Sequence, residues 1–321
     1  MQYHKLILTT IVLALVAFGC DSNDDGTTVG TSVATPSIKV APYYFSFTTG
    51  AAVSGVHDLI LRLDTTVTPS VYSVALNAAA NVSAAAIISG DFASAAYTGS
   101  ESFEYDTETD LVIGSGWMDP STYNQEDNHS IASNGTYYFV RTTDYQLLSF
   151  MVEKASTVAF DIKYAQMNAD STFPTAMSPI VSYSADEAAY FDMDGGTTVE
   201  PANWHMGLIT SRVPGAPFPM QNVILNFDNE TRVAVIDNKD FEDIESVPTG
   251  LTWVEDSHTS RPLAYSGAHE LITYNLDTHQ VSIKNDALVY IVDTGDGNYY
   301  KLRFINYDQP SGIVEFTYAA L

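Results

Sequence analysis

Apolar and aromatic residues fall into short runs along this chain, separated by clusters of Gly, Asn, Asp, Ser and Thr. The runs alternate apolar and polar positions or are continuously apolar, and they are rich in Tyr, Phe, Val and Thr. Such runs are typical of β-strands. Only the alanine-rich stretch 76–88 and a short acidic turn at 239–244 tolerate a helix. We therefore predict an all-β fold, with strands at 43–47, 58–63, 70–75, 137–141, 146–152 and 157–164 in the first half, and at 189–193, 205–210, 223–227, 232–236, 271–275, 279–283, 288–292, 299–305 and 312–318 in the second.

The order of these runs occurs twice. A Tyr-Phe pair opens each half, at 44–47 and at 190–193, and a strand ending in threonine followed by two long runs closes each half, at 138–164 and at 290–318. A repeat of this length can bury its own core, so it indicates a duplicated domain rather than a solenoid. Between the halves, Asn, Asp, Ser, Thr and two prolines make a linker composition. The expected division is a first domain at 41–165, a linker at 166–181 and a second domain at 182–321.

The N-terminus has the layout of a secretory signal peptide: Lys5, then an apolar run that ends at Phe18, then Cys20. The run is too short for a membrane-spanning helix. Cys20 is the one cysteine of the chain, and its position resembles the lipobox of bacterial lipoproteins, although Phe18 is bulkier than the usual residue. We predict a signal peptide at 1–19, a lipid anchor on Cys20 and a flexible tether at 20–40. The alternative is an ordinary signal peptide with an incidental cysteine.

Composition and charge narrow the function classes. The hydrophobic fraction is 45% and the aromatic fraction 12%, which excludes disorder for most of the length. Net charge is −26, a field that repels nucleic acid and anionic lipid headgroups. We therefore expect no nucleic-acid partner, and membrane attachment only through the lipid. The simplest reading of the acidic residues is a solvated, soluble surface.

Enzyme motifs are not found in the sequence. His269-Glu270 is not followed by a second histidine at the spacing of a zinc protease, and no Gly-x-Ser-x-Gly sequence occurs. The one cysteine is assigned to the anchor. We predict a protein that is not an enzyme, while scattered carboxylates leave catalysis open.

Two segments of the second half resemble a known family. Residues 288–304 followed by 312–318 resemble the C-terminal signature of the HmuY family of haem-binding bacterial lipoproteins. Residues 203–208 resemble that family's Asn-Trp-Asp-hydrophobic-Ala-Phe segment, with His205 at the aspartate position. The first half fits more loosely, with His57 in place of the tryptophan and Asp58 keeping the aspartate. The resemblance implies two tandem HmuY-like antiparallel β domains, of which the second is the closer match.

The resemblance also implies a haem held between β-hairpins, with two axial side chains on the iron and cations for the propionates. In the second half, the corresponding region offers His258 and His279 as iron ligands and Arg261 and Lys284 as propionate partners. Without the family, each histidine would be read as an ordinary surface residue. The region also holds His269, and the first half offers Met118 and His129 as the next candidates.

The function that this resemblance implies is haem capture for uptake, with hand-over to an outer-membrane haem receptor. The protein would be lipid-anchored to the bacterial outer membrane or cell surface. The alternative is a surface interaction or carbohydrate-binding lipoprotein that keeps the fold without binding haem. The placement of His258 and His279 separates the two, since a haem ligand pair must face one another across a gap as wide as a porphyrin.

Overall fold

The structure is a computed structural model that describes residues 30–66, 70–87, 91–173, 176–183, 188–211, 220–237, 239–275 and 277–321. The expected signal peptide and Cys20 lie outside the described residues. The strands, β1 to β22, pair in antiparallel sheets, and no α-helix occurs in the described part of the chain. The all-β prediction is therefore confirmed. None of the described segments is a helix long and apolar enough to cross a membrane.

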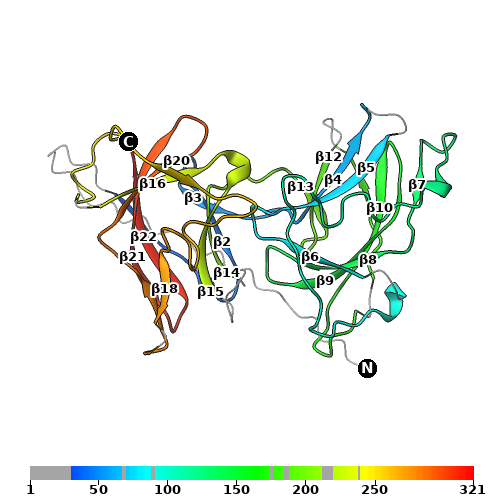
Figure 1. Cartoon of the computed structure of the whole chain (residues 1–321), viewed down its shortest axis with the longest axis horizontal. Helices are drawn as coiled ribbons and strands as arrows, with labels where there is room; N and C mark the ends of the chain where they lie inside the picture. Colours follow the sequence, from blue (N-terminus) through cyan, green and yellow to red (C-terminus); the bar gives the residue numbers. More distant parts are fainter. Residues whose placement is uncertain are drawn as a thin grey trace, which may run out of the picture.

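The strands form two lobes that lie side by side along the long axis of the molecule (Figure 1). Lobe one comprises the described residues of 56–199 and has two sheets, with strand orders β13-β12-β4-β5 and β11-β10-β9-β8-β6, and β7 pairs with β9. In β10, Phe160, Ile162 and Tyr164 are buried while Asp161 and Lys163 are partly exposed, the alternation that a sheet with one buried face requires. The elements of lobe one are β4 (Leu59–Asp64), β5 (Val71–Leu76), β6 (Ser83–Ile87), η1 (Phe92–Ser94), η2 (Pro120–Thr122), β7 (Ile131–Ala132), β8 (Tyr137–Arg141), β9 (Leu147–Ala155), β10 (Ala159–Gln166), β11 (Ile180–Ser182), β12 (Ala188–Asp192) and β13 (Thr197–Val199).

Lobe two comprises the described residues of 30–53 and 204–321. Its sheets have strand orders β3-β2-β14-β15 and β1-β22-β21-β20-β16-β17, with a separate β18-β19 hairpin. Phe45, Val292, Phe304 and Phe316 from the two sheets meet in one core. The elements of lobe two are β1 (Thr31–Ala34), β2 (Tyr43–Ser46), β3 (Ala51–Val53), β14 (Met206–Ser211), β15 (Met220–Leu225), η3 (Phe227–Asn229), β16 (Arg232–Ile236), β17 (Trp253–Glu255), β18 (Ile272–Asn275), β19 (Gln280–Ile283), β20 (Val289–Asp293), β21 (Tyr299–Asp308) and β22 (Ile313–Ala320).

Each half of the chain gives its first strands to the lobe that the other half completes. In lobe two, β2 pairs with β14, with Phe45 opposite Met206. In lobe one, β12 pairs with β4, with Phe191 opposite Leu59. Likewise β1 pairs with β22, and β11 pairs with β10. The two lobes therefore have matching strand orders, and the chain crosses between them after β3 and again after β13 (Figure 1).

At each crossing, a side chain at an equivalent position accepts a backbone hydrogen bond from the exchanged hairpin. Asp58 accepts a hydrogen bond from the backbone N–H of Met193, at 2.8 Å, and thereby holds the β12–β13 hairpin in lobe one. At the corresponding place in lobe two, His205 Nδ1 accepts the N–H of Phe47 at 3.1 Å and holds the β2–β3 hairpin. Burial lowers the pKa of His205, in keeping with a neutral ring that accepts at Nδ1. A different side chain thus makes the same tie in each lobe.

The exchange of strands changes the expected division of the chain. Val181, Ala189 and Phe191, expected in the second domain or its linker, belong to the core of lobe one, and Phe45, expected in the first domain, belongs to that of lobe two. Neither 41–165 nor 182–321 therefore forms a complete hydrophobic core from its own residues. The sequence repeat is local, whereas strand pairing here is long-range.

Two shorter stretches also differ from expectation. The predicted tether at 20–40 includes strand β1, and Ile38 is fully buried, so this part is folded. The alanine-rich stretch at 76–88 ends β5, turns, and forms β6 rather than a helix. Its turn residues Ala78, Ala79 and Ala80 are buried, and Ala79 and Ala80 pack with Trp204 and Ile224 of the other lobe. Small side chains are needed there for close approach, so tertiary packing overrides helix propensity.

Candidate functional site

His258 lies where the two lobes meet. It follows β17 in lobe two, and its Nδ1 is 2.8 Å from the backbone oxygen of Asp106 in lobe one. Its ring packs edge-on against Phe227, with ring centroids 4.8 Å apart. Because a carbonyl oxygen only accepts, Nδ1 carries the proton and the neutral ring keeps its lone pair on Nε2. The imidazole is therefore held in the tautomer that ligates metals through Nε2.

Arg261, three residues further on, joins the lobes. Its guanidinium is 2.9 Å from a carboxylate oxygen of Asp256 and donates to the carbonyls of Ala78 and Ala79 in lobe one. The carboxylate of Asp256 also accepts the backbone N–H of Leu225, at 2.8 Å. Arg261 was predicted to pair with a haem propionate; in the structure three hydrogen bonds of its guanidinium go to Asp256, Ala78 and Ala79.

A cavity of about 380 Å³ lies beside His258 and Arg261, between the lobes. Its walls combine aromatic, amide and aliphatic side chains with a glycine-containing loop, a mixture typical of small-molecule sites. This volume is within the usual range for a ligand pocket. Both lobes contribute to its lining, which includes Asn81 and Tyr105 from lobe one and Asn222, Ile224, His258 and Tyr265 from lobe two.

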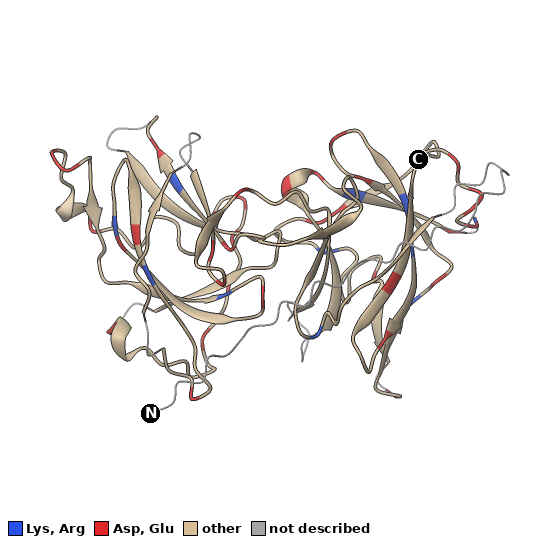
Figure 2. Ribbon diagram, turned by 180° about the vertical axis from the view of Figure 1, so that it is seen from behind, with Lys and Arg blue, Asp and Glu red and all other residues tan. Residues whose placement is uncertain are grey.

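His258 also lines a second, larger cavity of about 610 Å³ with a different character. Six carboxylates line it, and of its basic residues Arg232 is paired with Asp293 at 2.8 Å. Figure 2 shows that acidic residues outnumber basic ones across both lobes. The carboxylates lining this cavity, Glu108, Asp228, Glu230, Glu255, Asp256 and Asp293, make it unfavourable for an anionic ligand such as haem.

His279 and Lys284 lie on and beside the β18–β19 hairpin. His279 is exposed in the hairpin turn, and its Nδ1 is 2.6 Å from the hydroxyl of Tyr274. Lys284 pairs with Glu270 at 3.1 Å and lines a small cavity with His269 and Tyr290. Neither of the two cavities lined by His258 includes His279. The structure therefore brings His258 and Arg261 together, but places His279 and Lys284 around a separate hairpin.

The first-half candidates are separate from one another as well. Met118 packs against the core of lobe one, beside the buried Trp117. His129 is half-buried, and its Nδ1 is 2.6 Å from the hydroxyl of Tyr123. This Tyr–His bond matches the one between Tyr274 and His279. Sequence reasoning expected Tyr274 only as an aromatic wall of the haem site and did not pair either tyrosine with its histidine, although the repeated Thr-Tyr-Asn that precedes each histidine was a visible signal.

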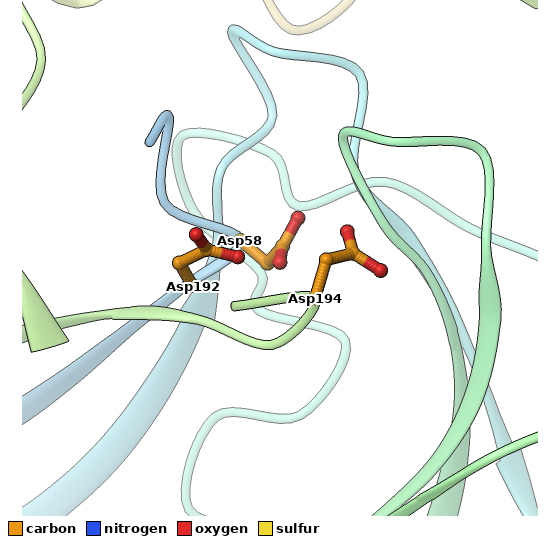
Figure 3. Close-up of side chains that lie close together, drawn as sticks. All are labelled: Asp58, Asp192 and Asp194. Atoms are coloured by element: carbon orange, nitrogen blue, oxygen red, sulfur yellow. The ribbon is translucent and has the colours of Figure 1, made fainter. Parts of the chain in front are cut away.

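A cluster of three carboxylates marks the crossing in lobe one (Figure 3). Ligand oxygens of Asp58, Asp192 and Asp194 lie within 4.8 Å of one another. Both oxygens of Asp58 accept backbone N–H groups, from Thr143 at 2.7 Å and Met193 at 2.8 Å. Burial raises the pKa of Asp194 to about 6, and that of Asp58 well above its usual range. These two hydrogen bonds give Asp58 a structural role, because they hold the β12–β13 hairpin in lobe one.

His57, at the position of Trp204 in the other half, is buried without a hydrogen-bond partner for either ring nitrogen. Its ring packs on Tyr190 with centroids 4.9 Å apart, as Trp204 packs on Tyr44 at 4.9 Å. Burial lowers the pKa of His57 to about 4. His57 is therefore a neutral packing residue, which agrees with its place at the equivalent of a core tryptophan.

Comparison with protein families gives one match. The model of the family described as HmuY protein matches residues 184–318. No curated protein and no solved structure matches the chain. The matched range includes His258, the β18–β19 hairpin with His279, and strands β12 and β13, which pack in lobe one. Residues 184–318 are thus similar to the HmuY family, and this range contains His258, Arg261, His279 and Lys284 but not the alternative candidates Met118 and His129.

Proposed function

We propose that this protein binds haem at the junction of its two lobes and carries it as a cell-surface lipoprotein, without catalysing a reaction. The observation that carries the proposal is His258, an imidazole inside the HmuY-matched region whose Nδ1 is held by the Asp106 carbonyl. Metal-ligating histidines have their second nitrogen bonded in this way. In the neutral ring Nε2 is then the atom available to haem iron.

The charge distribution supports the 380 Å³ cavity as the haem site rather than the acidic one. Haem carries propionates, which the excess of carboxylates over cations in the larger cavity would repel. The smaller cavity is lined by amide and phenol side chains rather than carboxylates, and Arg261 at its wall supplies positive charge even while bound to Asp256. Ile224 and the ring of Tyr265 offer apolar surface to the porphyrin.

His279 and Lys284 remain predicted contacts to haem from the hairpin side. The Nδ1 of His279 is 2.6 Å from the hydroxyl of Tyr274, and in the tautomer in which that oxygen accepts from Nδ1–H this imidazole presents Nε2. Anchoring through a lipid on Cys20 and hand-over to an outer-membrane receptor complete the proposed function. Both rest on the sequence and on the resemblance to haem-binding lipoproteins.

The test compares haemin binding by the purified chain with that of His258→Ala. Loss of an iron ligand should weaken binding by about tenfold or more and change the Soret band. His269→Ala is the matched control, since His269 lies in the same loop but outside both cavities lined by His258. Equal haemin affinity in His258→Ala and the unaltered chain would remove His258 as a ligand. No saturable binding by the unaltered chain would favour the interaction lipoprotein without haem.

A further inference from the structure

The acidic cavity of about 610 Å³ is built by segments that the fold brings together from both lobes. In the large sheet of lobe two, Arg232 of β16 stands opposite Glu255 of β17 on one side and Asp293 of β20 on the other. Cross-strand neighbours project from the same face of a sheet, so these three residues contribute to one wall. Glu108, from a loop of lobe one, also lines the cavity.

The turn at η3 forms a further part of the wall, and close packing fixes its place. A Cβ on Gly295, whose φ is 78°, would lie 2.1 Å from the carbonyl oxygen of Asn229. Only glycine permits this approach. Asp228 and Glu230 therefore lie beside the turn that follows β20, and both line the same cavity.

The positive charges at this cavity are fewer than its carboxylates. Among the described lining residues, Arg232 is the one with a permanent positive charge, and its guanidinium is 2.8 Å from the carboxylate of Asp293. Within the described ranges, no ion pair forms at Glu108, Glu230 or Glu255. The cavity therefore keeps an excess of negative charge.

Asp256 adds a buried acceptor that the protein does not use. Its side chain is fully buried, and Oδ2 accepts from Arg261 at 2.9 Å and from the backbone N–H of Leu225 at 2.8 Å. Oδ1 has no hydrogen-bond partner in the part of the chain that the structure describes. The two oxygens of a carboxylate point apart, so Oδ1 is turned away from these donors, and Asp256 lines the acidic cavity. Leaving a buried carboxylate oxygen without a donor is costly, and a cationic ligand would relieve that cost.

The pKa values of two carboxylates indicate the same lack of compensation. Burial raises the pKa of Asp256 and that of Asp228, although the nearby Arg261 acts in the opposite direction on both. A bound cation would favour the ionised form of each carboxylate.

The spread of the carboxylates favours an organic cation with several charges over a single metal ion. Among the described residues, ligand oxygens converge within 4.8 Å at Asp58, Asp192 and Asp194, outside this cavity. A volume of about 610 Å³ is suited to a small organic molecule. Phe227 and Tyr299 also line the cavity, and aromatic rings attract ammonium groups and pack against methylene chains.

We propose that the acidic cavity binds a linear polyamine, whose separate ammonium groups pair with carboxylates on different walls. Glu230 on the η3 turn and Glu255 on β17 are the exposed carboxylates that would hold its charges, above the buried Asp256. The site is distinct from the 380 Å³ cavity assigned to haem, although His258 lines both. It goes beyond the proposed function, because no haem contact is assigned to any of these carboxylates.

The test is isothermal titration calorimetry of the purified chain with spermidine, at about 0.15 M ionic strength, where attraction to the general surface is screened. The unaltered chain should bind one equivalent, and Mg²⁺ at the same concentration should not displace it. Glu230→Gln combined with Glu255→Gln should weaken binding about tenfold, or about 1.4 kcal/mol, which two partly exposed ion pairs can supply. Because both side chains are exposed, the melting temperature should not change.

The matched control is Glu126→Gln combined with Glu200→Gln. Both residues are exposed and neither lines the acidic cavity, so this variant changes net charge equally and should bind spermidine as the unaltered chain does. Equal weakening in the two double variants would show a response to net charge alone and would overturn the site. Unsaturable binding by the unaltered chain, or displacement of spermidine by Mg²⁺, would overturn it as well. Haemin binding is measured separately, so failure of the polyamine site leaves the proposed function standing.

Discussion

The exchange of strands predicts which fragments of this chain fold. A fragment from 182 to 321 contains the whole second repeat but lacks β1 to β3, and so removes Ile38, Tyr44, Phe45 and Phe47 from lobe two. All four are at most 4% exposed. Burying a large apolar side chain contributes about 1.5–3 kcal/mol, so the fragment loses about 6–12 kcal/mol. A domain is stable by about 5–15 kcal/mol in total, so lobe two should not fold in this fragment.

Urea unfolding followed by circular dichroism tests this prediction. The fragment 182–321 should show no cooperative transition, whereas 56–200, which holds every strand of lobe one, should unfold cooperatively. The matched control is a circularly permuted chain of lobe two. It begins at residue 204 and runs to 321, a flexible linker then joins 321 to residue 30, and the chain ends at 53. That chain has the composition of lobe two, and it should unfold cooperatively. A cooperative transition of 182–321 at the urea concentration of the permuted chain would refute the strand exchange as the basis of folding.

Further predictions concern single residues. Asp58→Ala leaves two buried N–H groups, of Thr143 and Met193, without an acceptor, so urea unfolding should show a loss of about 2–5 kcal/mol; an unchanged midpoint would contradict the tie. His57 has a pKa of about 4 in the folded protein and about 6.5 in the unfolded chain. Between these pH values the unfolded chain binds more protons, so His57 lowers the free energy of unfolding as pH falls from about 6.5 to 4. His57→Phe should therefore be more stable than the unaltered chain, with a gap that widens by up to about 3 kcal/mol at low pH; a gap independent of pH in urea unfolding would contradict the neutral buried ring. Cys20→Ala should leave the protein folded but move it from the membrane fraction to the soluble fraction; full retention in the membrane fraction, seen by immunoblot, would show that Cys20 is not the anchor.

The sequence was sufficient for the fold class and for most strand positions. Alternation such as that of Phe160, Ile162 and Tyr164 identifies a strand with one buried face, because the period is local. The partner of each strand was not predictable. Phe45 and Phe191 lie at the start of equivalent repeats. The sequence around each residue does not indicate whether its hairpin packs with its own half of the chain or with the other half. Pairing depends on long-range packing and on the short crossings after β3 and β13.

The candidate site was predictable only in part. The family resemblance directed attention to His258 and Arg261, which the structure places at one cavity. The partners of these residues, the carbonyls of Asp106, Ala78 and Ala79, come from the other half and are backbone atoms, so side-chain identity carried no signal for them. The Tyr–His pairs differ in this respect, because the repeated Thr-Tyr-Asn was readable in the sequence.

The most direct test of haem binding is a titration of the purified chain, without its signal peptide, with haemin. If imidazole nitrogens ligate the iron, the Soret band should sharpen and shift with each addition, and then stop changing at a fixed ratio of haemin to protein. Electron paramagnetic resonance of the saturated complex should show ferric haem with nitrogen ligation. A band that grows in proportion to added haemin without saturation, with the spectrum of free haemin, would contradict the proposal that this protein binds haem.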